Sequence, residues 1–194
     1  MGELKKPFRL ETERLVLRDW APGDIDRFVE GTNTPAVMRW LGGLLDTAKI
    51  DMLESRLMAF QVEYGHTFWI VERKQDGEIL GFCGLKRVDA PNSTIAGEFE
   101  IGWRLREDAW GKGYAKEAAT ASLTAGFERF GARTIYAITV IGNTASWGLM
   151  KRLGMARRED LDYPDSRFEL PLRDTIVYSI ERDIWLRRCS PDRA

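Results

Sequence analysis

Apolar and polar residues alternate along residues 13–18, which predicts a short strand near the start of the chain. Three helical segments follow it, each opened by a residue that can cap a helix: Asp24, Thr34 and Asp46. In the third segment apolar residues recur at helical spacing over residues 50–60. The first third of the chain is therefore predicted as one strand followed by three helices.

Strands dominate the middle of the chain. Residues 68–72 and 79–85 are mostly apolar, and the turn Gln75-Asp76-Gly77 between them is typical of a hairpin. A third strand spans residues 98–105, where Gly102 marks a bulge or a close approach of the backbone. The remaining elements are a helix over 112–130, a strand over 133–141, a helix over 143–153 and a strand over 175–180.

This order of elements predicts one α+β domain over residues 1–194, built around a largely antiparallel sheet. The length fits a single domain, and apolar residues make up 44% of it, enough for a full core. A formal net charge of -1 argues against nucleic acid as the default partner. No apolar stretch is long enough to span a bilayer, so we expect a cytoplasmic protein without a membrane partner.

The sequence also argues against a metal site. Its single histidine, His66, rules out a multi-histidine centre. The two cysteines, Cys83 and Cys189, lie far apart and fit no metal-ligand spacing. Acid–base chemistry is therefore expected to fall to carboxylates, hydroxyls or water.

The most informative segment is the glycine turn, residues 110–115, which joins a predicted strand to a predicted helix. A helix N-terminus exposes unpaired N–H groups with a partial positive charge, and glycines let an anion approach them. Lys112 and Arg106 add positive charge, although a plain turn without a ligand fits the same residues. A P-loop does not fit, because it requires glycine at position 106 and serine or threonine at 113. A dinucleotide fingerprint requires glycine where Lys116 stands.

The glycine turn resembles motif A of the GCN5-related N-acetyltransferase (GNAT) superfamily, written (Q/R)-x-x-G-x-(G/A). Gly113 and Ala115 match it, whereas Trp110 replaces the first residue, as in the branch that resembles ribosomal-protein-alanine acetyltransferases of the RimJ/RimL type. Further matching segments are residues 12–18, 100–105, 143–146, 153–155, 171–173 and 177–178. The resemblance implies the GNAT fold: a mixed, mostly antiparallel sheet, splayed between its fourth and fifth strands, with helices on both faces.

The resemblance also implies acetyl-CoA as the acyl donor, with no metal. The pantetheine arm would lie between the splayed strands, paired with the main chain of one of them and contacted by an asparagine. The pyrophosphate would lie on the glycine turn and the start of the next helix. The cofactor residues expected on this basis, with the added charge of Arg106, are Trp103, Leu105, Arg106, Gly111, Lys112, Gly113, Tyr114, Ala115, Lys116 and Asn143.

The reaction implied is direct attack of an amine on the thioester. Glu100 stands where similar enzymes place a general base that acts through water, and Glu98, on the same face of the strand, is the fallback. Many relatives assist the departing thiolate with a tyrosine, but Met150 occupies that position here. Ser146, which the RimJ/RimL-like branch carries, would assist it instead. Without such a role, Glu100 would be an ordinary strand glutamate that faces solvent or pairs with an arginine, and Ser146 would only satisfy a backbone group.

The expected acceptor is a primary amine of a small molecule or of a peptide N-terminus. Trp40, Trp147 and Glu98 are the candidate substrate contacts, and the acidic loop at residues 160–173 would attract a cationic amine. Two alternatives remain open: a ribosomal-protein N-terminal acetyltransferase, and a non-catalytic module that binds acyl-CoA. The apolar tail at residues 184–186 and an exposed sheet edge fit a monomer or a homodimer.

Overall fold

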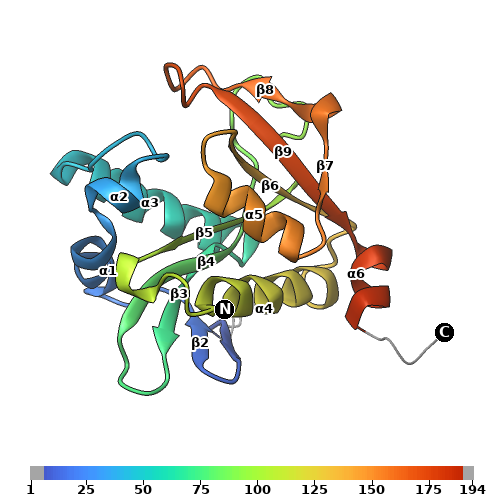
Figure 1. The fold of residues 1–194 in the computed structure, drawn as a ribbon. Helices are drawn as coiled ribbons and strands as arrows, with labels where there is room; N and C mark the ends of the chain where they lie inside the picture. Colours follow the sequence, from blue (N-terminus) through green and yellow to red (C-terminus); the bar gives the residue numbers. More distant parts are fainter. Residues whose placement is uncertain (1–6, 190–194) are drawn as a thin grey trace.

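The computed structural model describes residues 7–189 and shows one twisted sheet with helices on both faces (Figure 1). Within these residues nine strands form the sheet in the order β1-β2-β3-β4-β5-β6-β9-β7, and β8 pairs with β9 outside this path. All the paired strands described are antiparallel except β5 and β6, which confirms the predicted α+β class. The strands are β1 (Arg9–Glu11), β2 (Leu15–Arg18), β3 (Phe68–Arg73), β4 (Ile79–Arg87), β5 (Phe99–Leu105), β6 (Thr134–Val140), β7 (Ala156–Arg157), β8 (Tyr163–Pro164) and β9 (Asp174–Glu181).

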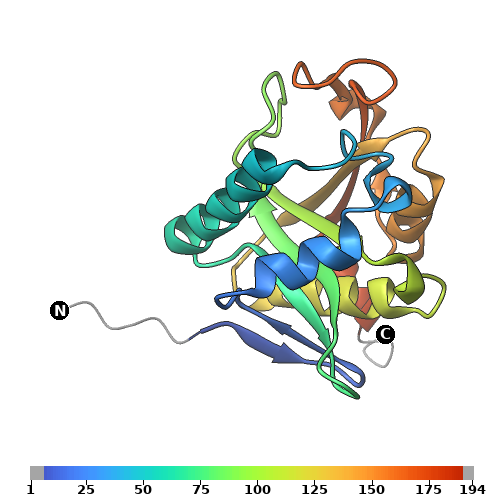
Figure 2. The ribbon, with the colours of Figure 1, turned by 90° about the vertical axis from the view of Figure 1, so that its left-hand side faces the viewer.

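Different helices cover the two faces of the sheet. On one face α1 packs against β4, β5 and α3, and Figure 2 shows α1 and α3 on the side turned to the viewer. On the other face α4 packs against β2, β4 and β5 and contacts α5. The helices are α1 (Asp24–Thr32), α2 (Pro35–Met38), α3 (Thr47–Tyr64), α4 (Tyr114–Glu128), α5 (Thr144–Arg152) and α6 (Arg182–Cys189), with 3-10 turns at Glu107–Ala109 and Glu159–Leu161.

Local sequence signals set most of the helix starts. The side chains of Thr34 and Asp46 cap α2 and α3, as predicted. The prediction for α1 was wrong in detail, because Gly23, with a φ of 85°, occupies the cap position. Asp24 is the first helical residue, and its carboxylate pairs with Arg18 at 2.5 Å instead of capping the helix.

β5 and β6 separate soon after they meet. Their parallel pairing is limited to Phe99 with Ile135 and Glu100 with Tyr136, while β4 continues to pair with β5 as far as Leu105. The main chain of β5 beyond Glu100 therefore has no strand partner on its β6 side. This separation confirms the predicted splay. The fourth and fifth strands of the prediction are β5 and β6 here, because β1 was not predicted.

Two glycines of the sheet are required by close packing. A Cβ at Gly102 would lie 2.6 Å from Cζ of Phe68, and the β4–β5 register runs unbroken through this residue. Close approach, and not a bulge, therefore explains Gly102. The irregularity lies between β3 and β4 instead, where Gly81 has a φ of 145° and a Cβ would lie 2.0 Å from the carbonyl oxygen of Arg104.

Four small elements were not predicted from the sequence pattern: β1, β7, β8 and α6. The apolar tail forms part of α6, in which Trp185 is only 4% exposed and its ring centroid lies 6.2 Å from that of Phe127. Ile184 and Leu186 stay exposed. No helix of the described part of the chain is sufficiently long and apolar to cross a membrane.

Candidate functional site

A cleft of about 660 Å³ opens where β5 and β6 diverge. Its walls come from α2, from the end of β5, from the glycine turn with the start of α4, and from α5. The cleft brings together most of the residues that the sequence assigned to the cofactor. These are Trp103, Leu105, Gly111, Gly113, Ala115, Lys116 and Asn143, and the candidate residues Trp40 and Ser146 line the same cleft.

The glycine turn presents an uncapped helix end to this cleft. Gly113 occupies the cap position of α4 with a φ of 84°, and no side chain of the described residues caps the helix. Gly111 has a φ of 71°, and apart from the glycine and its chain neighbours no described atom lies within 4 Å of the position that its Cβ would take. The N–H groups of the first turn therefore stand beside open space, and Lys116 adds a positive charge. This end of the cleft suits an anion such as a pyrophosphate.

Lys112 and Tyr114 do not line the cleft but belong to a clamp behind the glycine turn. Arg14 donates from Nε to a carboxylate oxygen of Glu117 at 2.7 Å and from Nη1 to the carbonyl oxygen of Lys112 at 3.0 Å. The same guanidinium lies 4.6 Å from the ring centroid of Tyr114, and Thr12 donates to Glu117 at 2.6 Å. The clamp fixes the backbone of the turn and the first turn of α4, and none of its residues lines the cleft.

The clamp also offsets the negative charge of Glu117, which would oppose anion binding. Glu117 lies in the first turn of α4, where a bare carboxylate would repel a phosphate. Burial raises its pKa, but hydrogen bonds from Thr12 and Arg14 outweigh burial, so the pKa is lowered. The carboxylate is therefore ionised, and the guanidinium of Arg14 offsets its charge.

Replacing Arg14 tests the clamp. We expect Arg14→Ala to raise KM for acetyl-CoA about three- to tenfold with little change in kcat, because it loosens the anion site and leaves Glu117 uncompensated. Arg9→Ala is the control, since Arg9 is an exposed residue that pairs with Glu11. Steady-state kinetics with varied acetyl-CoA measure the effect. An unchanged KM, or a fall in kcat alone, would contradict this role.

Glu100 lies at the closed end of the splay, in the last residue pair that joins β5 to β6. Its carboxylate pairs with Nζ of Lys86 on β4 at 2.8 Å, and both side chains are 15% exposed. Lys86 also pairs with Asp89 at 2.8 Å. Burial lowers the pKa of Lys86, but the two carboxylates outweigh burial and the pKa is raised. Glu100 is thus a half-buried carboxylate paired with a lysine, whereas Glu98 is exposed and precedes β5.

The start of α5 forms another wall of the cleft. Asn143 caps the helix, because its Oδ1 accepts a hydrogen bond from the Ser146 N–H at 3.3 Å, which leaves its amide NH₂ for a ligand. Ser146, Leu149 and Arg152 succeed one another at intervals of three and all line the cleft. That helical spacing is the signal by which Leu149 and Arg152 are identifiable in the sequence. Met150 is buried in the core.

The comparison with known proteins decides the family. The family model described as an acetyltransferase (GNAT) domain matches residues 14–156. The chain belongs to the GNAT family. The matched segment contains Arg14 and Glu117 of the clamp, Glu100, the glycine turn and all of α5.

Individual relatives agree with this assignment. The uncharacterized protein YkkB of Bacillus subtilis is 35% identical over 123 residues, which cover 63% of this chain and 70% of that protein. The FsC-acetyl coenzyme A-N(2)-transacetylase of Aspergillus fumigatus is 32% identical over 60% of this chain and 51% of its own length. The crystal structure of the acetyltransferase from Agrobacterium tumefaciens matches with a TM-score of 0.74 and 25% identity, covering 93% of this chain and 98% of that one.

The GNAT family uses acetyl-CoA as its co-substrate, and the residues of the cleft fit that molecule. The uncapped end of α4 offers donors to a pyrophosphate. The edge of β5 that lacks a strand partner offers main-chain groups to the amides of a pantetheine arm.

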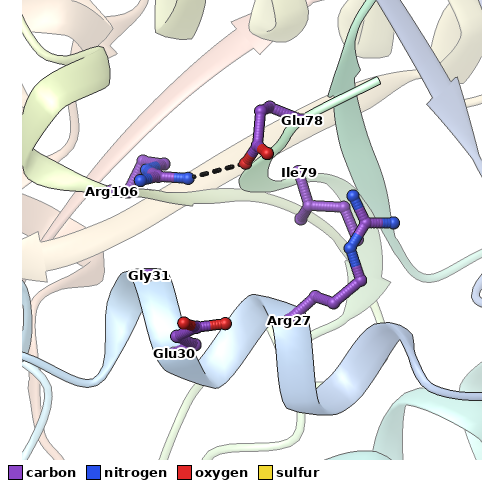
Figure 3. A pocket seen from close by; sticks show the side chains of 6 residues that line it. All are labelled: Arg27, Glu30, Gly31, Glu78, Ile79 and Arg106. Carbon is purple, nitrogen blue, oxygen red and sulfur yellow. Dashed lines mark hydrogen bonds and ion pairs between the residues drawn. The ribbon is translucent and has the colours of Figure 1, made fainter. Parts of the chain in front are cut away.

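Arg106 of this GNAT domain does not reach the cleft. Its guanidinium pairs with Glu78 at 3.0 Å and with Asp108 at 2.6 Å. Figure 3 shows it beside a second hollow, of about 410 Å³, which Arg27 and Glu30 of α1 also line. The expected contribution of Arg106 to the pyrophosphate site is therefore not supported, since two carboxylates already offset its charge.

The two candidate tryptophans have different positions in the GNAT domain. Trp40 lines the cleft, and its ring packs so closely on the β6–α5 turn that a Cβ at Gly142 would lie 2.5 Å from its Cη2. Trp147 does not line the cleft: its Nε1 donates to the carbonyl oxygen of Ile141 at 3.0 Å, and Lys151 lies 4.5 Å from its ring centroid. Trp147 therefore fastens α5 to the end of β6, and only Trp40 remains a candidate for the acceptor.

The acidic loop has less free charge than the sequence suggested. Three of its carboxylates form ion pairs with arginines close to them in the chain. The pairs are Asp160 with Arg158, Asp162 with Arg157, and Asp165 with Arg167. Attraction of a cationic amine by these three residues is consequently weak.

Proposed function

We propose that this GNAT domain transfers the acetyl group of acetyl-CoA to a primary amine of a small molecule or of a peptide N-terminus. Glu100 accepts a proton from the amine through a water molecule, so that the amine nitrogen bonds to the acetyl carbon. The carbon–sulfur bond then breaks, and Ser146 donates a hydrogen bond to the departing thiolate until it takes up a proton. One observation carries the proposal: the uncapped end of α4 and Ser146 line the cleft, and Glu100, which does not itself line the cleft, lies at the closed end of the gap between β5 and β6.

Release of CoA thiol from acetyl-CoA tests this function. A panel of primary amines that includes amino acids, dipeptides and cationic antibiotics is offered, and turnover with at least one class is expected. Saturable CoA binding without turnover of any amine would indicate the non-catalytic module instead. Transfer confined to the N-terminus of a ribosomal protein, seen as a mass shift of that protein, would favour the ribosomal alternative.

Ser146 is tested by removing its hydroxyl. We expect Ser146→Ala to lower kcat about three- to tenfold, the value of one neutral hydrogen bond, without changing KM for acetyl-CoA. Thr144→Ala removes an exposed hydroxyl from the same turn of α5, outside the cleft, and serves as the control. Equal kinetics of the two variants would show that Ser146 only supports the helix.

A further inference from the structure

Arg104 is a cation of the cleft that faces the same side of the sheet as Glu100. Along β5 the side chains alternate, and Leu105 packs in the core cluster that contains α4. Arg104 points the other way, with its guanidinium 5.4 Å from the ring centroid of Phe28 on α1 and 5.2 Å from that of Phe82 on β4. It lines the cleft together with α2.

The guanidinium of Arg104 forms no ion pair with any residue that the structure describes. Within residues 7–189 its Nε and Nη1 atoms are shut off from solvent and have no hydrogen-bond partner. Burial lowers its pKa to about 10. The other cations of the cleft, Arg39, Lys116 and Arg152, are exposed to solvent. The two aromatic rings compensate an enclosed guanidinium only in part, because a buried charge is normally retained with a hydrogen-bonded partner of opposite charge.

We propose that the partner of Arg104 is a carboxylate of the acceptor, so that the acceptor is an amine that also carries an acidic group. This inference rests on the proposed acetyl transfer. A phosphate of CoA is the less suitable partner, because the uncapped N-terminus of α4 and Lys116 offer it donors in another part of the cleft. The guanidinium of Arg104 lies instead between Phe28 of α1 and Phe82 of β4.

The spacing of Arg104 and Glu100 limits the size of this acceptor. Arg104 lies four positions after Glu100, so their Cα atoms are about 13 Å apart along the strand. Part of that distance is taken up by the two side chains. A dipeptide or an amino acid whose amine and carboxylate are several bonds apart fits the remainder.

Matched pairs of amines test the inference. Thiol release from acetyl-CoA is measured with alanylalanine and with its C-terminal amide. The same comparison is made for ω-amino acids of increasing length and the corresponding amides. For the best pair we expect kcat/KM of the acid to exceed that of the amide at least about tenfold, the value of a charge-assisted hydrogen bond. Arg104→Met should remove the difference while KM for acetyl-CoA and turnover of the amide are retained, and Arg104→Lys should restore part of it.

Arg87→Met is the matched control. Arg87 also lies against aromatic rings, 3.6 Å from the ring centroid of Phe99, and its Nε is likewise enclosed without a partner, but it does not line the cleft. We expect this variant to keep the preference for acids. The melting temperature of Arg104→Met, unchanged or raised because an uncompensated charge is removed, shows that the variant is folded.

Binding measurements separate this inference from the proposed function. N-acetyl-alanylalanine and its amide, titrated calorimetrically into the CoA-bound protein, report carboxylate recognition without turnover. Preference for the acid that is lost in Arg104→Met supports the inference even if no amine is acetylated. Turnover of amines without any preference for acids, absence of binding of the acetylated acid, or a raised KM for acetyl-CoA in Arg104→Met would each overturn it.

Discussion

Glu100→Gln is expected to lower kcat by about a hundred- to ten-thousandfold, the usual contribution of a positioned general base. The substitution keeps the size of the side chain and removes only its ability to accept a proton. It leaves Lys86 with Asp89 as a partner at 2.8 Å, so the buried ammonium retains a counter-charge and the sheet should stay intact. KM for acetyl-CoA is expected to change little, because Glu100 does not line the cleft.

Steady-state kinetics over a range of pH measure this effect. The variant should differ from the wild type in its pH–rate profile, because the proton of the amine no longer passes through this carboxylate. Glu98→Gln decides between the two candidate carboxylates, and the exposed position of Glu98 predicts a much smaller loss. A Glu100→Gln enzyme with normal turnover and a normal pH profile would show that Glu100 has only the structural role of pairing with Lys86.

Most of the architecture follows from local signals in the sequence. The side chains of Thr34, Asp46 and Asn143 cap the helices that they were expected to open, and the Gln75-Asp76-Gly77 turn joins β3 to β4. The splay between β5 and β6 was different. No local pattern predicts it, and it was expected only because the glycine turn and the other motifs resemble those of a known family.

The parts of the site that the sequence did not reveal depend on partners that are distant in the chain. Arg14 and Glu117 are 103 residues apart, and no periodicity links a residue before β2 to the first turn of α4. Arg104 could not be identified from the sequence either. Its unusual feature is that Nε and Nη1 have no hydrogen-bond partner in the described structure, which a sequence cannot display. Short edge strands such as β1 arise from pairing with a neighbour and leave almost no pattern of their own.

The acidic loop is a case in which the sequence contained the answer. Its carboxylates have arginines nearby in the chain: Arg158 lies two residues before Asp160, and Arg167 lies two residues after Asp165. Counting acidic residues alone suggested a surface that attracts cations. The alternation of charges instead indicates local ion pairs. The cleft therefore points to an acceptor recognised by its negative charge, through Arg104, and not to one attracted by the acidic loop.

Gly111→Ala and Gly131→Ala together test whether the glycine turn binds the donor. Both glycines have a positive φ, 71° and 69°, and apart from each glycine and its chain neighbours no described atom lies within 4 Å of either Cβ position. The backbone strain of alanine should therefore be the same at the two sites and lower the free energy of unfolding by about 1–2 kcal/mol in each variant. Of these two glycines, Gly111 lines the cleft and Gly131 does not. The new methyl group would therefore occupy the space beside the N-terminus of α4 only in Gly111→Ala.

We expect Gly111→Ala to raise the Kd of CoA about tenfold or more, because a pyrophosphate can no longer approach the N–H groups closely. Gly131→Ala should bind CoA like the wild type despite an equal loss of stability. Urea unfolding measures the loss of stability, and calorimetric titration measures the Kd of CoA. If the two variants bound CoA equally well, the turn would be a structural connection and the phosphate groups would have to lie elsewhere in the cleft. Weaker binding by Gly111→Ala alone assigns the anion site to this turn, since the shared strain cancels between the two variants.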